Sequence, residues 1–166
     1  MNRFEIKACG AADLAMVTAL AKRIWPVVYA EIISREQIAY MLNMMYVPEV
    51  LARELRDGIR FDLLYVNGEP VGFAAYGPPS HGKLKLHKLY LLPEFHGRGC
   101  GSQLLQHVIV QARQINCSTV VLNVNKHNQQ AIRAYHRNGF QVAASVVNAI
   151  GNGFVMDDFV MELELS

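Results

Sequence analysis

The chain has 166 residues, of which 52% are hydrophobic and 18% are charged, and its formal net charge is +2. This is the length and composition of a single folded domain, residues 1–166, and the near-balanced charge argues against a nucleic-acid partner. The start of the chain lacks the apolar core of a signal peptide, and the chain lacks an apolar run of ~20 residues that could span a bilayer. We therefore expect a cytoplasmic protein with no membrane partner.

The cysteines and histidines show no metal-binding pattern. Cys9, Cys100 and Cys117 are widely spaced and form no Cys-x-x-Cys pair, and the six histidines do not have the spacing of a zinc site. We expect three reduced, buried cysteines and no metal.

The first third of the chain predicts one strand followed by helices. Residues 4–8 alternate in polarity as a strand does, and Asp13 is placed to cap a helix. Ser34 and Gln37 have the spacing of a capping box for a second helical stretch, which we expect to break near Pro48 and then resume. The apolar face of the first helix is formed by Leu14, Val17, Ala21 and Ile24.

Three strands are predicted in the middle of the chain. Asn67-Gly68 separates two strand-like runs, 61–66 and 71–76, which is a strong signal for a hairpin. Residues 82–92 extend this sheet.

A glycine-rich loop follows the third of these strands. The apolar run halts at Pro93, and Gly97, Gly99 and Gly101 precede an amphipathic helix over residues 103–115. Glycine lets the backbone turn sharply and approach a ligand, and the N–H groups and dipole of a helix N-terminus favour an anion. The loop therefore predicts a phosphate-binding site, although the glycines alone are also compatible with a plain strand-to-helix turn.

The common nucleotide-binding motifs do not fit this loop. A dinucleotide-binding fingerprint needs a glycine where Ser102 stands, and the Gly-Lys-Ser/Thr of a P-loop is absent. The loop must be of another type.

A second strand and helix follow. Residues 120–125 form the predicted strand, and the helix after it ends at Gly139, where a left-handed residue is expected. The sequence Gly151-Asn-Gly153 predicts the turn between the last two strands.

These two segments together resemble the GNAT-type N-acetyltransferases. The acetyl-CoA loop of that family is a strand, a proline, Gln/Arg-x-x-Gly-x-Gly/Ala and a helix, which reads here as residues 96–101 with His96 in place of Gln or Arg. The family's second signature, Asn-x-x-Ala-x-x-x-Tyr and then Gly-Phe, is matched by Asn128, Ala131, Tyr135, Gly139 and Phe140. The resemblance covers most of the chain.

The resemblance implies the GNAT fold, an α/β (α+β) arrangement. We expect a twisted mixed sheet with helices on both faces, in the order β-α-α-β-β-β-α-β-α-β-β. It also implies transfer of an acetyl group from acetyl-CoA directly to a primary amine, either of a small amine or polyamine or of a protein. The alternative is a catalytically silent sensor that binds acyl-CoA, and a homodimer is compatible with the sequence.

The family's contacts to acetyl-CoA fall on twelve positions of this chain: Leu89, Leu91, His96, Gly97, Arg98, Gly99, Cys100, Gly101, Ser102, Asn128, Ala131 and Tyr135. By this resemblance, the backbone N–H of Leu91 polarises the thioester carbonyl and Tyr135 protonates the coenzyme A thiolate. Asn128 both caps a helix and holds the pantetheine arm. Core packing is the alternative for Leu91 and Tyr135.

The general base and the amine site are less constrained by the sequence. His87 precedes the acetyl site on the same strand and its near-neutral pKa suits proton removal, but an exposed strand histidine is equally compatible. Five residues are candidates for the substrate pocket: Trp25, Tyr29, Glu31, Asp157 and Asp158. The aromatic residues would line it and the carboxylates would attract a cationic amine, with core packing and simple solvation as the alternatives.

Overall fold

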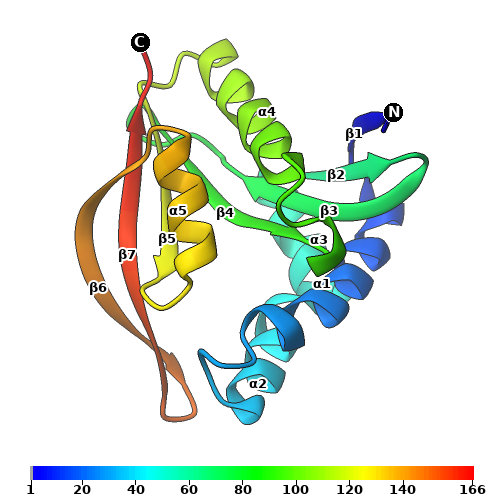
Figure 1. Cartoon of the computed structure of the whole chain (residues 1–166), viewed down its shortest axis with the longest axis vertical. Coiled ribbons are helices and arrows are strands. Elements are labelled where there is room, and N and C mark those ends of the chain that lie inside the picture. Colours follow the sequence, from blue (N-terminus) through cyan, green and yellow to red (C-terminus); the bar gives the residue numbers. More distant parts are fainter. Residues whose placement is uncertain (1) are drawn as a thin grey trace.

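The structure, a computed structural model, describes residues 2–166. The chain begins with strand β1 (Phe4–Ala8) and the single turn η1 (Ala11–Asp13), which are followed by the helices α1 (Leu14–Val28), α2 (Arg35–Met45) and α3 (Pro48–Arg56). Three strands come next, β2 (Arg60–Val66), β3 (Glu69–Tyr76) and β4 (Lys83–Leu91), and then the turn η2 (Pro93–Phe95). The last elements are α4 (Cys100–Gln114), β5 (Thr119–Asn125), α5 (Gln129–Arg137), β6 (Gln141–Gly151) and β7 (Phe154–Glu164) (Figure 1).

All seven strands form one mixed sheet. Their order is β1-β2-β3-β4-β5-β7-β6, and β4 and β5 are its parallel pair. A parallel pair needs a long crossover, which α4 supplies. Asn67 and Gly68 both have positive φ, 52° and 85°, as a tight hairpin turn between β2 and β3 requires. The predicted fold class is confirmed.

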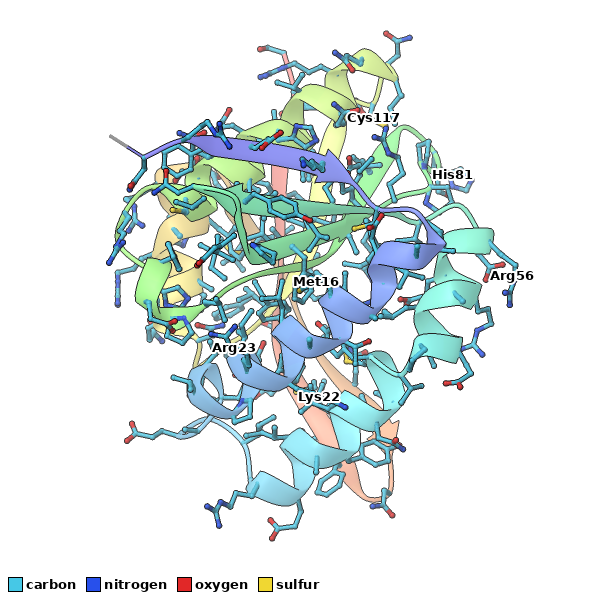
Figure 2. All side chains as sticks on the ribbon, turned by 90° about the vertical axis from the view of Figure 1, so that its right-hand side faces the viewer. Met16, Lys22, Arg23, Arg56, His81 and Cys117 are labelled. Atoms are coloured by element: carbon cyan, nitrogen blue, oxygen red, sulfur yellow. The ribbon has the colours of Figure 1, made fainter. Side chains whose placement is uncertain are left out.

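Helices cover both faces of the sheet. The ring of Trp25 on α1 lies 5.5 Å from that of Tyr90 on β4, whereas α4 approaches the next residue, Leu91, at Gly101. Neighbouring strand residues point to opposite faces, so α1 and α4 lie on opposite sides. Figure 2 shows α1 in front of the sheet, with the exposed Lys22 and Arg23 on its outer side.

Two predicted helix caps are only partly formed. Asp13 occupies the cap position of α1, but its carboxylate accepts a hydrogen bond from the N–H of Gly10 at 2.9 Å. Ser34 accepts from the N–H of Gln37 at 3.1 Å, yet the Gln37 side chain donates to the carbonyl of Val155 on β7 at 2.8 Å. A tertiary hydrogen bond thus replaces half of the capping box. Helix α4 also begins at residue 100, three residues earlier than expected.

The three cysteines are free and buried, as expected, and burial raises the pKa of Cys9 to about 12. Within residues 2–166, no group of three or more His, Cys, Asp or Glu side chains is placed to hold a metal ion. Over the same residues, no helix has the length and apolar character needed to cross a membrane.

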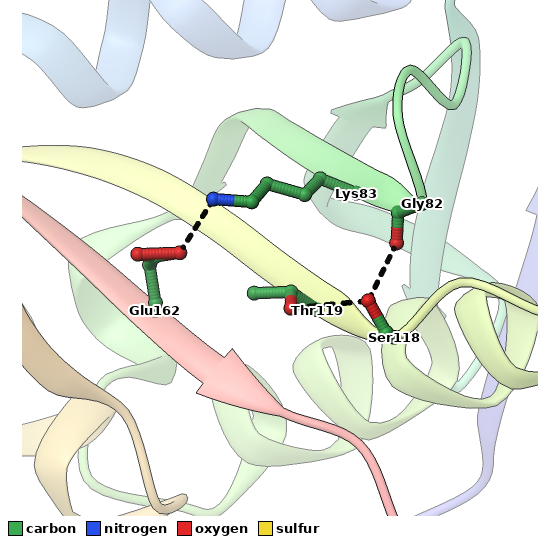
Figure 3. Close-up of polar contacts among 5 residues, drawn as sticks. All are labelled: Gly82, Lys83, Ser118, Thr119 and Glu162. Carbon is green, nitrogen blue, oxygen red and sulfur yellow. Dashed lines mark hydrogen bonds and ion pairs between the residues drawn. The ribbon is translucent and has the colours of Figure 1, made fainter.

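The parallel strands β4 and β5 are paired only near their starts. Their pairing runs from Lys83↔Thr119 to Leu86↔Leu122. This end is held by the Ser118 hydroxyl, which donates to the carbonyl of Gly82 at 3.2 Å, and by the 3.0 Å ion pair of Lys83 with Glu162 on β7 (Figure 3). Farther along, β4 stays paired with β3 and β5 with β7, so the two strands diverge.

Candidate active site

A cavity of about 360 Å³ lies where β4 and β5 diverge. One end reaches the glycine loop and the start of α4, and the other reaches Tyr29 at the end of α1. This volume is in the range of small-molecule sites. The predicted cofactor loop and part of the predicted amine pocket therefore open into one cleft.

The three glycines of the loop have two different structural roles. Gly97 and Gly99 have φ of 74° and 80°, a conformation that other residues adopt only with strain, and a Cβ at either would meet no described atom within 4 Å. At Gly101, by contrast, a Cβ would lie 3.4 Å from a methyl group of Leu91, so this glycine allows α4 to pack closely on β4.

The start of α4 can bind an anion. Gly99 is the N-cap, and the first N–H that donates back to it is that of Gln103, at 3.0 Å. The preceding amides, of residues 100–102, have no acceptor within the helix. Gly99, Gly101 and Ser102 line the cleft, so these donors fit a phosphate group placed there.

The backbone of β4 presents donors to the same cleft. The N–H of Leu92 donates to the carbonyl of Val71 on β3 at 2.8 Å. Because N–H directions alternate along a strand, the N–H groups of Leu89 and Leu91 point the other way, toward the diverging β5. The Leu91 side chain is itself buried, so it belongs to the core while its backbone faces the cleft.

His96 and Arg98 are held by neighbouring residues of the loop. The Nε2 of His96 lies 3.0 Å from the carbonyl oxygen of Leu91 and donates to it, which ties the loop to the end of β4. The exposed guanidinium of Arg98 lies 5.2 Å from the ring centre of Phe95. The Cys100 side chain is fully buried, so this residue can reach a ligand only through its backbone.

Helix α5 forms the opposite wall. Asn128 is its N-cap, and its side-chain oxygen accepts from the N–H of Ala131 at 3.3 Å, as the sequence predicts. A side-chain hydrogen bond from Asn128 also partly offsets the raised pKa of Tyr29. The residues of α5 and its flanks that line the cleft are Asn128, Gln130, Ala131, Ala134, Tyr135, Arg137 and Asn138. Sequence reasoning missed Gln130, Ala134, Arg137 and Asn138, although the spacing of Ala134 and Asn138 from Ala131, three and seven residues, could have revealed those two.

Tyr135 stays protonated at neutral pH. It lines the cleft, and burial, with a smaller contribution from the nearby Tyr29, raises its pKa well above the ordinary value of 10. A protonated phenol is the state that a proton donor needs.

Two tyrosine hydroxyls meet at the other end of the cleft. Those of Tyr29 and Tyr90 lie 2.8 Å apart, and burial raises the pKa of Tyr29 to about 12. Trp25 is 1% exposed and its ring lies 4.5 Å from that of Tyr29, so it supports this wall from behind. Tyr90 was missed, because its position in an apolar strand predicts only core packing.

Asp157 and Asp158 point to opposite faces of the sheet. Asp157 is half-buried and pairs with Lys126 at 2.8 Å. Asp158 is buried, and no partner for its Oδ1 lies within residues 2–166. Desolvation raises the pKa of Asp158, which a hydrogen bond from Asn123 partly offsets. Asn123 lines the cleft, and the charge of Asp158 contributes to the raised pKa of Tyr29.

His87 lines the cleft at a β-bulge. Ala75 pairs with Lys88 but Tyr76 pairs with Leu86, so His87 is the extra residue of β4. Its Nε2 lies 2.8 Å from the carbonyl of Gly77, and desolvation is the main cause of its lowered pKa.

Glu31 stands apart from these residues. It is exposed in the segment after α1, and it makes no side-chain hydrogen bond or ion pair with any residue from 2 to 166.

Known proteins resemble this chain over most of its length. Residues 16–140 match the model of the acetyltransferase (GNAT) family. An uncharacterised N-acetyltransferase of Mycobacterium tuberculosis is 30% identical over 92% of this chain and 98% of its own length. The spermidine N(1)-acetyltransferase of Thermoplasma acidophilum is 27% identical over 92% of this chain and 95% of its own length.

A solved structure has the same fold. The PaiA N-acetyltransferase of T. acidophilum, in complex with coenzyme A, is 26% identical with a TM-score of 0.83, covering 98% of this chain and 99% of that chain.

Proposed function

The chain belongs to the acetyltransferase (GNAT) family and is an N-acetyltransferase, and from this premise we propose that it acetylates a primary amine of a small polycation such as a polyamine. The observation that carries the proposal is a single cleft with an anion-binding helix N-terminus at one end and a buried carboxylate beside the other.

The cleft fits acetyl-CoA, which supplies the acetyl group as an activated thioester. The free amides at the start of α4 would hold the pyrophosphate, since the open side of Gly97 and Gly99 leaves room for it. The N–H groups of Leu89 and Leu91 would bind the pantetheine arm and polarise the thioester carbonyl. The solved T. acidophilum relative holds coenzyme A, which supports this assignment.

Two residues are suited to move protons. An alkyl amine with a pKa near ~10.4 is almost fully protonated at neutral pH and must lose a proton before it attacks. The lowered pKa of His87 keeps it neutral, and its Nε2–H donates to Gly77, which leaves Nδ1 free to accept that proton, directly or through water. Tyr135 would give its proton to the departing thiolate.

The surroundings of Asp158 are evidence for a cationic substrate. A buried carboxylate oxygen without a partner is costly in a folded protein and calls for an explanation. A cation that arrives with the substrate would supply the missing partner. A polyamine carries a second charged nitrogen that is not acetylated, and the T. acidophilum relative is named a spermidine N(1)-acetyltransferase.

Mass spectrometry of the products tests the proposal. The protein and acetyl-CoA would be incubated separately with spermidine, with a simple alkyl monoamine and with a peptide that has a free N-terminus. We expect acetylated spermidine to form fastest. Acetylation of the peptide alone would contradict the proposed polyamine substrate and indicate a protein substrate. Coenzyme A binding without transfer to any amine would instead support the sensor.

A further inference from the structure

Acetyl transfer to an amine requires more proton movements than His87 and Tyr135 supply on their own. A charged amine loses one proton before it attacks, which His87 is suited to accept, and its nitrogen loses a second proton as the amide forms. Tyr135 gives a proton to the departing thiolate and must then regain one. A path from the amine to Tyr135, which rests on the proposed function of both residues, would return to Tyr135 the proton that the nitrogen loses.

The hydroxyls of Tyr29 and Tyr90 form a pair inside the cleft. Their oxygens lie 2.8 Å apart, and both residues line the cavity. Trp25 lies behind them, with its ring centre 4.5 Å from that of Tyr29 and 5.5 Å from that of Tyr90, so both rings are held in place. A hydroxyl can donate and accept a hydrogen bond at the same time. Two hydroxyls held in contact can therefore take up a proton at one end and release one at the other.

Tyr90 places one end of this pair beside the acetyl site. It directly precedes Leu91, whose N–H would polarise the thioester carbonyl, and its ring packs on the α1 side of the sheet. Desolvation is the main cause of the raised pKa of Tyr29, and the charge of Asp158 contributes to it, so this carboxylate lies near the pair. The tyrosine hydroxyls are thus on the side of the sheet from which a cationic amine would arrive.

Tyr29 places the other end of the pair near Tyr135. Desolvation raises the pKa of Tyr135, and the charge of Tyr29 raises it further, so the two phenols lie within electrostatic range of one another. Hydrogen bonds from Tyr90 and from the Asn128 side chain partly offset the pKa of Tyr29, which burial raises to about 12. Since both groups donate to the Tyr29 oxygen, its own hydrogen is left to donate into the cleft.

We propose that the hydroxyls of Tyr90 and Tyr29 carry the second proton of the attacking amine to Tyr135. As the carbon–nitrogen bond forms and the carbon–sulfur bond breaks, the nitrogen gives its proton to the Tyr90 oxygen. The Tyr90 hydrogen passes to Tyr29, the Tyr29 hydrogen passes to Tyr135, and Tyr135 gives its own proton to the thiolate. The products are the amide, coenzyme A as the thiol and three neutral tyrosines, so the protons balance.

Tyr29→Phe and Tyr90→Phe test this relay, because each removes one hydroxyl and keeps the ring. Acetyl transfer from acetyl-CoA would be measured in single turnovers at saturating spermidine, so that weaker amine binding does not lower the rate. We expect each variant to be slower by roughly 10- to 100-fold, since water can partly replace a lost hydroxyl. The double variant should be no slower than the slower single variant, because a path broken once is already broken.

Two further variants sharpen the test. Tyr46→Phe is the matched control: Tyr46 is buried with its ring 5.7 Å from that of Trp25, but it does not line the cleft, so its loss should leave the rate unchanged. Adding Tyr29→Phe to Tyr135→Phe should cause no further loss, because the path then has no acceptor at its end. Circular dichroism would verify that every variant folds.

Solvent isotope effects separate proton transfer from a packing role. Several protons that move together make the wild-type rate curve with the fraction of D₂O, and Tyr29→Phe should make this dependence less curved. A wild-type rate in Tyr29→Phe, an unchanged isotope dependence, losses that multiply in the double variant or an equal loss in Tyr46→Phe would overturn the relay. If the wild-type chain acetylates only the peptide, the same variants would be measured with the peptide, so failure of the polyamine assignment does not decide the relay.

Discussion

The two halves of the cleft differ in whether backbone groups or side chains form them. The half near the glycine loop is largely backbone: amides at the start of α4 and the N–H groups of Leu89 and Leu91, all within residues 89–102. The half where we propose that the amine binds is made of side chains. Tyr29 and Tyr90 line it, and Asp158, which does not line the cavity, acts through its charge on Tyr29; the three come from distant segments. A site formed by backbone groups requires glycine at fixed positions, which the sequence reveals. A site formed by side chains from distant segments has no fixed spacing in the sequence.

The largest expected effect is at Tyr135, where the two halves meet. Tyr135→Phe keeps the ring and its packing but removes the proton donor. We expect kcat to fall by roughly 10²–10⁴-fold, with little change in the affinity for acetyl-CoA. Single-turnover transfer by the folded variant measures this. A rate close to wild type would show that the thiolate is protonated by another group.

The next effect is at His87, and it depends on pH. A base works when unprotonated, and the pKa of His87 is lowered from 6.5, so kcat/KM should be constant near neutral pH and fall only at a pH below 6.5. His87→Gln should lower kcat/KM by about 10²-fold. It should also abolish the fall in kcat/KM at low pH that protonation of this histidine causes. His81→Gln, in the exposed loop before β4, is the control and should leave the profile unchanged. An unaltered profile in His87→Gln would assign the proton to a different acceptor.

A substitution at Asp158 tests amine binding separately from cofactor binding. Asp158→Asn has nearly the same shape but cannot neutralise a cation, so the KM for spermidine should rise by roughly 10- to 100-fold while the KM for acetyl-CoA stays the same. Asp157→Asn is the control, because Asp157 faces the other side of the sheet and pairs with Lys126. If both variants behave alike, or if both KM values rise together, Asp158 does not bind the amine.

The smallest effect is expected in the cofactor half, at Gly99. Valine there would be strained at a φ of 80°, and we expect the affinity for coenzyme A to fall by about tenfold. Calorimetry should show a smaller loss for the pantetheine fragment, which lacks the pyrophosphate. Gly68→Val is the control: Gly68 has a similar φ of 85° and an equally open surrounding, but lies in the β2–β3 turn. It should lower thermal stability without changing affinity, and equal losses for both ligands in Gly99→Val would contradict the phosphate assignment.

The sequence predicted the fold, and the loop glycines and Asn128 that it singled out line the cleft. The Asn67-Gly68 hairpin, the helix break at Pro48 and the left-handed Gly139 follow from local conformational preferences, and the structure has all three. The capping box at Ser34 failed in part, because the Gln37 side chain finds a partner on β7, 118 residues away. The sequence also could not separate the two roles of the loop glycines. A glycine required for a positive φ and a glycine required for close packing against Leu91 are the same residue type.

What the sequence determined by itself is the backbone: the order of the elements, the glycine loop at a helix start and the Asn128 cap. These depend on residues close together in the chain, whose types and spacing decide the conformation. Only the tertiary structure decided that β4 and β5 separate after Leu86, that Asp157 and Asp158 serve opposite faces, and that Tyr90 meets Tyr29. Those arrangements depend on which strands pair and where the pairing stops, and strand pairing joins residues that the linear sequence keeps far apart.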